Sequence, residues 1–341
     1  MPGSNVTPTR GLEYSGDVHG LLEARLSTEV LEAFHDRNIF WGGGLMSKQM
    51  LAPGSNEWRF PIFGESPEDA DRHTPGTFID GGTLVQDRGS VKIDDNLVKA
   101  LDLPFVDVSM SQWDILSAAG KEIGRILAEK MDKYSAAVAV NAARTAAVTN
   151  VHNGGQVITR TGPLETNAYA FTSAGSGLLQ DDLADMARLF DEDNIPEDNR
   201  FAVMSPRLRS VLTRDATTLM NRDVVPETYT DRTMRKVLTV EGWSILTSKH
   251  LPSTNITTGP SGQQGDFRST GGGGGATGLP MVICLHSPAG QTGAVGAVMS
   301  SLGIRSVIQQ DEQREVWFTK GSIHAGIDKL AVWMAGEIRA T

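Results

Sequence analysis

The chain has 341 residues and carries 31 lysines and arginines against 41 aspartates and glutamates, which gives a net charge of −10 at pH 7. Binding to nucleic-acid phosphates draws its affinity from clustered cations, and no run of lysine and arginine occurs, so the sequence disfavours a DNA-reading role. Cys284 is the single cysteine, which excludes an intrachain disulfide and a cysteine-based zinc site.

The N-terminal part predicts an arm, a helix and a long ribbon. Residues 1–20 are polar, rich in Gly and Pro, and lack the apolar segment of a secretory signal. Residues 21–34 have apolar side chains at helical spacing, and Gly42-Gly43-Gly44 interrupts that pattern. No stretch approaches the roughly 20 apolar residues of a membrane span. We therefore expect a soluble protein made in a reducing compartment.

An acidic loop lies between strand-like segments early in the chain. Alternating apolar residues predict strands at residues 57–63, 91–93 and 101–108. The first two would form the stem of a long two-stranded hairpin near 57–63 and 90–95. Because a two-stranded ribbon is only marginally stable alone, it must pack on something else. It either covers an active site or reaches another copy of the protein.

The longest helical pattern runs from Asp114 to Val148. At 1.5 Å rise per residue this helix would span roughly 50 Å, which is more than one compact domain requires, so we expect a strut. Gly120 and Gly124 would let another backbone approach closely. The expected packing face consists of Ile115, Ala119, Ile123, Leu127, Tyr134 and Val138.

The second half of the chain alternates helices with strands. A helix over 178–194 has Asp181 and Asp182 at its expected N-terminal end, and Ser205-Pro206 opens another helix after a strand at 201–204. Further strands are expected at 237–246, 282–285, 316–318, 323–327 and 330–334, with a Gly-rich loop at 253–279. This mixture predicts an α+β fold.

No motif points to catalysis, a cofactor or a metal. Gly273, Gly275 and Gly278 fit a dinucleotide pattern, but Pro280 follows where a helix would have to open. The seven histidines form no zinc motif. The acidic run 191–194 lacks the glycine and the final glutamate of a calcium loop. Cys284 reads as a small core residue, and we expect no enzyme.

Five segments, taken together, resemble the major capsid proteins of T7-like short-tailed phages, which have the HK97-type capsid fold. They are FPIFGESPEDADRHTPGTFIDGG, VKIDDNLVKALDLPFVDVSMSQWD, MARLFDEDNIPEDNRFAVMSPRLRSVL, GWSILTSKHLP and KGSIHAGIDKLAVWMAGEI. The matches keep the family order from about residue 22 to residue 338. The chain departs from the family at Ile327-Asp328-Lys329, where an R-P turn is usual, and the loop at 253–279 aligns with no family pattern.

The resemblance implies the parts of an HK97-like capsid subunit. These are an N-arm at 1–55, an extended E-loop at 56–92, a P-domain at 93–177 with a spine helix at 114–148, an A-domain at 178–300 and returning strands at 301–341. The E-loop would lie across a neighbouring subunit. Its expected contact residues are Trp58, Phe60, Ile62, Phe63, Glu65, Glu68, Asp69, Asp71, Arg72, Phe78 and Ile79.

The implied function is that of a major capsid protein of the virion. Hexamers and pentamers would assemble in the host bacterial cytoplasm around a scaffolding protein, with a portal protein at one vertex; a decoration or cement protein is a further candidate partner. The icosahedral head would enclose double-stranded DNA through non-specific contacts, without a membrane. No lysine occurs from 49 to 91, so the lysine–asparagine cross-link that some capsids of this fold form through the E-loop is excluded.

Two other functions stay open from the sequence alone. The first is the shell protein of a cellular encapsulin-like nanocompartment, which would share the fold. The second is a two-domain hydrolase or transferase, which would need a convergent cluster of polar side chains.

Overall fold

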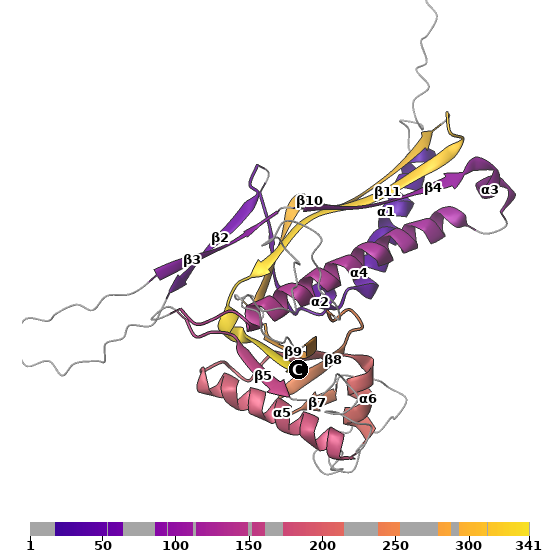
Figure 1. Ribbon diagram of the computed structural model, residues 1–341. Helices are drawn as coiled ribbons and strands as arrows, with labels where there is room; N and C mark the ends of the chain where they lie inside the picture. Colours follow the sequence, from indigo (N-terminus) through magenta and orange to yellow (C-terminus); the bar gives the residue numbers. More distant parts are fainter. Residues whose placement is uncertain are drawn as a thin grey trace, which may run out of the picture.

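The computed structural model describes residues 18–52, 54–63, 86–93, 95–111, 114–148, 152–160, 173–214, 238–252, 279–287, 293–311 and 313–340. The arm at 1–17 and most of the Gly-rich loop at 253–279 lie outside these residues. Figure 1 shows an elongated upper part, a lower part with its own sheet, and a projecting hairpin. Within the described residues, no helix is long and apolar enough to cross a membrane.

The elongated part is a twisted sheet with two helices along it (Figure 1). Its strands lie in the order β1-β10-β11-β4, and their bounds are Ser47–Met50 for β1, Val295–Asp311 for β10, Val316–Lys329 for β11 and Asp95–Pro104 for β4. The helices are α1, Val18–Arg37, and α4, Ile115–Ala143. A short helix, α3, Phe105–Met110, follows β4 at the far end of this sheet.

Helices α1 and α4 touch through glycine, as the sequence predicted. A Cβ added at Gly124 would lie 2.4 Å from the Val30 carbonyl oxygen, and one at Gly120 would lie 2.9 Å from the Leu26 side chain. Only a residue without a side chain allows this approach at Gly124. Helix α4 begins where expected, because the Asp114 carboxylate accepts from the Ser117 N–H at 3.1 Å. It ends at Ala143, five residues before the expected end.

The lower part is a mixed sheet covered by two helices. Its strand order is β5-β12-β9-β6-β8-β7. The bounds are Gln156–Arg160 for β5, Ala335–Ala340 for β12, Leu279–His286 for β9, Arg200–Met204 for β6, Trp243–Thr247 for β8 and Leu238–Val240 for β7. Helices α5, Ser173–Glu192, and α6, Pro206–Arg214, pack beside it. Cys284 is fully buried in this sheet, which confirms its reading as a core residue.

Four expected elements differ from the structure near prolines, glycines and chain reversals. The strand expected at 101–108 stops at Pro104, which has no N–H for the ladder, and α3 takes the rest. The strand expected at 237–246 is a hairpin, because Glu241 and Gly242 both have positive φ, 47° and 77°. The two strands expected at 316–318 and 323–327 are one strand, β11.

Two further differences concern the ends of elements. Helix α5 begins at Ser173, so Asp182 lies well inside it and not at its N-terminus; the buried Asp182 carboxylate instead accepts from Arg160 Nε at 2.7 Å. The expected strand at 330–334 contains a 3-10 turn, Val332–Met334, before β12 begins. The turn is needed because β11 and β12 belong to different sheets.

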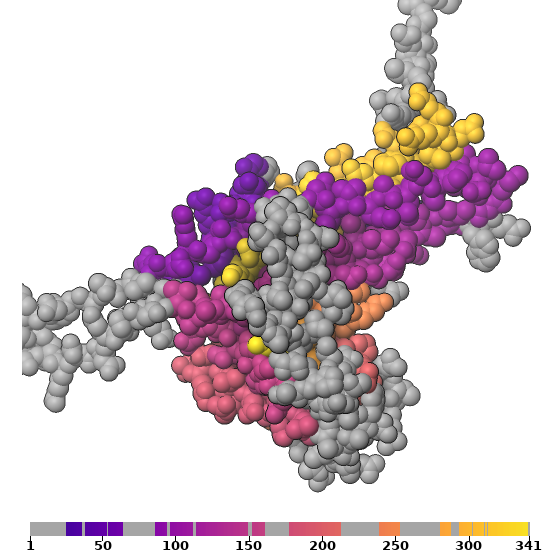
Figure 2. Space-filling model, viewed as in Figure 1, coloured from indigo at the N-terminus to yellow at the C-terminus, as the bar shows by residue number. Residues whose placement is uncertain are grey.

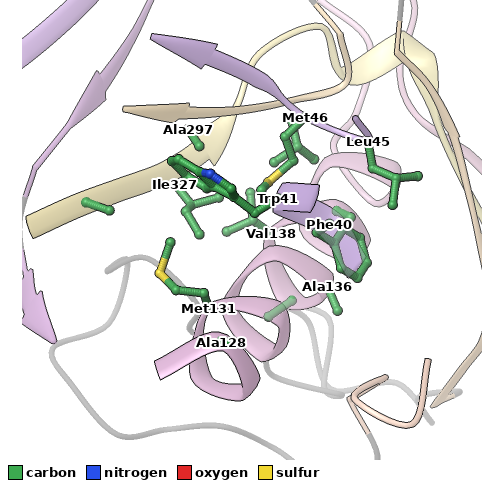
Figure 3. Packing of buried hydrophobic residues seen from close by; sticks show 14 of the residues in the cluster. Phe40, Trp41, Leu45, Met46, Ala128, Met131, Ala136, Val138, Ala297 and Ile327 are labelled. Atoms are coloured by element: carbon green, nitrogen blue, oxygen red, sulfur yellow. The ribbon is translucent and has the colours of Figure 1, made fainter. Parts of the chain in front are cut away.

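One hydrophobic core runs through both parts. It joins Ile123 of α4 and Ile323 of β11 to Ile283 of β9 in the lower sheet. Figure 3 shows its centre, where Met131 and Val138 of α4 face Ala297 of β10 and Ile327 of β11. The Arg144 guanidinium also reaches the buried Glu337 carboxylate of β12, with Nε–Oε2 at 2.6 Å and Nη2–Oε1 at 2.5 Å.

The close contact at Gly124 yields a test of this packing. Alanine is the better helix former by about 1 kcal/mol, yet Gly124→Ala should lower the free energy of unfolding by about 1–3 kcal/mol, because its methyl group collides with backbone. Gly177 in α5 is the matched control, since a Cβ there meets nothing within 4 Å, and Gly177→Ala should stabilise by about 0.5–1 kcal/mol. Urea unfolding measures both. Stabilisation by Gly124→Ala would contradict the close approach of α1 and α4.

Candidate assembly interface

The projecting hairpin consists of β2, Glu57–Phe63, and β3, Gln86–Lys92, paired antiparallel with Phe60 opposite Gly89. In the space-filling view it stands out at one end of the elongated part, and the turn between β10 and β11 lies at the other end (Figure 2). The first strand matches its prediction. The second begins and ends a few residues before the expected 90–95.

The apolar face of the hairpin packs on the protein's own body. Phe60 is 7% exposed and forms a small core with Leu51, Val91, Val298 and Leu330. Its ring lies across Gly89, because a Cβ there would sit 1.9 Å from the ring. Trp58 and Ile62 are half-buried beside this core, and the Trp58 and Phe60 ring centroids are 5.5 Å apart. The hairpin is therefore anchored at its base within one subunit.

Phe63 ends β2 with most of its side chain free. It is 60% exposed, and it is the last described residue before the acidic loop. Phe63 lies on the face of β2 opposite Phe60, and on that same face Arg59 and Glu57 are paired at 2.8 Å. The other candidate contact residues, Glu65, Glu68, Asp69, Asp71, Arg72, Phe78 and Ile79, lie outside the described residues, so their contacts stay predictions.

The six residues expected to pack α4 lie on its inner side to different depths. Ala119, Ile123, Leu127 and Val138 are buried, whereas Ile115 and Tyr134 are half-buried. Gly321 explains how β11 crosses the helix: a Cβ there would lie 2.4 Å from Ile123 Cγ2. From Ser135 to Val140 the helix is buried on every side, which a single apolar face does not predict.

A second exposed apolar feature lies on α3, which sequence reasoning read as a strand. Val106 is 55% exposed and Met110 is 81% exposed. Their spacing of four residues places them on one face of a helix. This spacing can be seen in the sequence and would have indicated a helix here. Because both side chains are apolar and exposed at an end of the molecule, this face is also suited to contact with another protein surface.

The buried ionisable groups are dispersed and do not converge on one site. Burial raises the pKa of Asp132 to about 6 against backbone hydrogen bonds that lower it. Burial likewise raises the pKa of Glu337, opposed by Arg144, and lowers the pKa of His250 and of His286. Among the described residues no group of three or more His, Cys, Asp or Glu could hold a metal ion.

A recess between α1 and the start of α4 is lined in part by Arg25, Glu29 and Asp114. These charges pair with each other, with Arg25 Nε at 3.2 Å from Glu29 and Arg25 Nη2 at 2.5 Å from Asp114. These ion pairs fasten α1 to the start of α4.

Comparison with known families decides what kind of protein has this architecture. The family model described as phage capsid protein matches residues 98–335, which is more than half of the chain. The chain belongs to the phage capsid protein family. The match covers most of β4, all of α4 and most of both sheets.

Solved structures agree with this assignment. The capsid structure of the cyanophage P-SCSP1u is 26% identical, with a TM-score of 0.66 over 87% of this chain and 86% of that chain. The mature capsid of bacteriophage PhiM1 is 14% identical, with a TM-score of 0.65 over the same shares. A virus-like particle from Pyrococcus furiosus is 11% identical, with a TM-score of 0.50 over 94% of this chain and 98% of that chain. No curated protein matches the chain.

The predicted HK97-like α+β capsid fold is confirmed by these likenesses. The protein is a major capsid protein, a structural component of an icosahedral bacteriophage shell. The alternative of an encapsulin-like compartment is not favoured, because the family that matches is that of phage capsids.

The two phenylalanines of β2 provide a test of the anchored hairpin. Phe60→Ala should lower the free energy of unfolding of the isolated subunit by about 3 kcal/mol, because it empties a buried site. Phe63→Ala should change it by less than about 0.5 kcal/mol, because the side chain is mostly in water. Thermal and urea unfolding of the unassembled protein measure both variants. Equal losses would mean that the hairpin lies elsewhere than on Val298 and Leu330.

Proposed function

We propose that this capsid protein tiles the head of a T7-like, short-tailed phage as hexamers and pentamers. The proposal assigns residues 1–55 to an N-arm, 56–92 to the E-loop, 93–177 to a P-domain with α4 as its spine, 178–300 to an A-domain, and 301–341 to returning strands. β5 and β12 pair with each other in the sheet of the lower part. The proposed A-domain sheet therefore includes one strand from residues 93–177 and one from residues 301–341.

The hairpin is the observation that carries this proposal. Its base is held by the subunit's own core at Phe60, while Phe63 at the end of β2 is 60% exposed. We propose that a neighbouring subunit covers the exposed Phe63 side chain, because removing aromatic surface from water is favourable. Interlocked subunits of this kind bury large obligate interfaces, commonly about 2,000–5,000 Å².

Opposite charges on the hairpin loop and on α4 also support a contact between two copies. Residues 64–85 contain five acids and one arginine. Helix α4 exposes Lys121, Lys130 and Lys133 on its outer side, whereas Arg125 on that side is already paired with Glu122 and Glu129. Opposite charges on two copies favour a defined register between them. We therefore propose that these lysines, on a neighbouring copy, form ion pairs with Glu65, Glu68, Asp69 and Asp71.

The remaining partners follow from the resemblance to short-tailed phage capsids. We propose assembly in the host bacterial cytoplasm on a scaffolding protein, with a portal protein at one vertex, a decoration protein as a further candidate, and packaged double-stranded DNA held without specific contacts. The negative net charge of −10 suits a container that must not grip the DNA phosphates. Maturation would be a rearrangement of subunits without a catalytic residue.

Electron microscopy of purified particles tests the role of the hairpin. Phe63→Asp should reduce the yield of closed particles by at least tenfold, because assembly would bury the new charge. The isolated subunit should keep its unfolding midpoint, because residue 63 is exposed there. Leu178→Asp is the control, since Leu178 is an exposed apolar residue of α5 outside the hairpin, and it should assemble normally. Normal assembly of Phe63→Asp would remove the hairpin from the interface.

Denaturing gel electrophoresis of mature particles tests the absence of a cross-link. Because no lysine lies between residues 49 and 91, boiling in detergent should release a single band at the subunit mass of 36.6 kDa. A ladder of covalent oligomers from particles boiled under reducing conditions would show that another pair of residues bonds the shell.

A further inference from the structure

The elongated sheet has one long edge that no described strand covers. β4 is its outermost strand on that side and spans ten residues. The other edge strands of the two larger sheets are short, with four residues in β1, five in β5 and three in β7. β4 also pairs with β11 from Asp95 to Pro104 without a bulge. Short strands, bulges and prolines usually protect a sheet edge, and β4 has only a proline as its last residue.

Two contacts show which backbone groups of β4 point toward β11. The Phe105 N–H, one residue beyond β4, donates to the Glu315 carbonyl oxygen at 2.9 Å. The Leu101 carbonyl oxygen accepts from Thr319 Oγ1 at 3.0 Å. Because alternate residues of an antiparallel strand direct these groups to opposite sides, the odd-numbered residues of β4 face β11. The residues that direct N–H and C=O groups to the free edge are therefore Asn96, Val98, Ala100 and Asp102.

The side chains of β4 differ between the two faces of the sheet. Leu97 and Leu101 pack against the main core on the face that meets α4. On the opposite face Asn96, Val98 and Asp102 are exposed, and the apolar Val98 is 46% exposed. The edge thus presents backbone donors and acceptors together with apolar surface and polar side chains.

We propose that β4 pairs with β4 of a second copy, antiparallel about a two-fold axis at Lys99, so that two subunits share one continuous sheet. A contact between identical edges is isologous and requires a two-fold axis, which an icosahedral shell provides. The inference is independent of the hairpin contact and of the hexamers and pentamers proposed above. It needs only that copies of this protein meet in a shell.

The four outward-facing residues fit this register. With the axis at Lys99, Asn96 lies opposite Asp102 of the second copy, and Val98 lies opposite Ala100. All four outward residues of each copy are then paired, so the join gains about eight backbone hydrogen bonds. The Asn96 amide can donate to the Asp102 carboxylate, and Val98 gains an apolar neighbour, each twice by symmetry.

Other positions of the axis use fewer of these groups. An axis at Ala100 would place Asn96 opposite Pro104, which has no N–H to donate. An axis at Val98 would place Asp102 beyond the first residue of β4 in the second copy. The axis at Lys99 is therefore the one that pairs the whole free edge.

This register also brings two lysines together. The two Lys99 side chains would lie side by side on the face that meets α4, and like charges opposite each other destabilise a sheet. Each Lys99 lies near Glu122 of its own α4, where it adds to the effect by which Arg125 lowers the pKa of Glu122. That carboxylate offsets part of the repulsion.

Disulfide formation between copies tests the position of the axis. In Lys99→Cys particles the two Cα atoms at the axis would lie about 4.5 Å apart, within the range of about 4.4–6.8 Å that a disulfide spans. Purified particles are oxidised with diamide and analysed on a non-reducing denaturing gel. We expect a band at twice the subunit mass of 36.6 kDa. Wild-type particles should lack this band, because Cys284 is fully buried.

Asp102→Cys is the matched control, because residue 102 is also exposed on β4 but would lie about 20 Å from its counterpart across the axis. The dimer band should be at least tenfold stronger in Lys99→Cys than in Asp102→Cys. If Lys99→Cys subunits do not assemble alone, particles co-assembled with wild-type subunits are oxidised instead. Lys99→Cys in assembled particles without the dimer band, or equal bands in both variants, would overturn the proposal.

Discussion

The approach of α1 to α4 at Gly124 is the contact on which the arrangement of this subunit depends. It lets the N-terminal segment lie against the long helix with only backbone between them at that point. From there the short helix α2, Ile39–Gly42, and β1 reach the four-stranded sheet, and β1 pairs with β10 in parallel. The hairpin β2–β3 follows β1 in the chain, and Phe60 holds it against Val298 and Leu330.

The hairpin is anchored to the subunit near Phe60, and the end of its first strand at Phe63 is exposed. Phe60 across Gly89 joins the hairpin to Val298 and Leu330, whereas Phe63 at the end of the same strand stays in water. Because both residues belong to one strand, the division needs no hinge. One strand thus has a buried residue that packs on the subunit itself and an exposed aromatic residue at its end.

The sequence predicted the elements that local patterns determine. Alternation located β2, apolar periodicity located α4, and Gly120 and Gly124 marked the crossing of α1. The patterns did not reveal contacts between distant segments: Arg144 pairs with Glu337 across 193 positions, and Asp132, a charge within a helix, is buried against α2. Alternation also shows that Trp58, Phe60 and Ile62 share a face, but not that this face meets the subunit's own body. The family resemblance came from the order of several segments, which no single residue supplies.

The hydrophobic core that includes residues of both sheets has a mechanical consequence. Two domains joined by a polar contact would rotate against each other under load, but here Ile123, Ile323 and Ile283 belong to one close-packed interior. Such a subunit behaves as a stiff plate. In a shell, a subunit of this kind is expected to bend little internally and to pass strain to its contacts with other subunits.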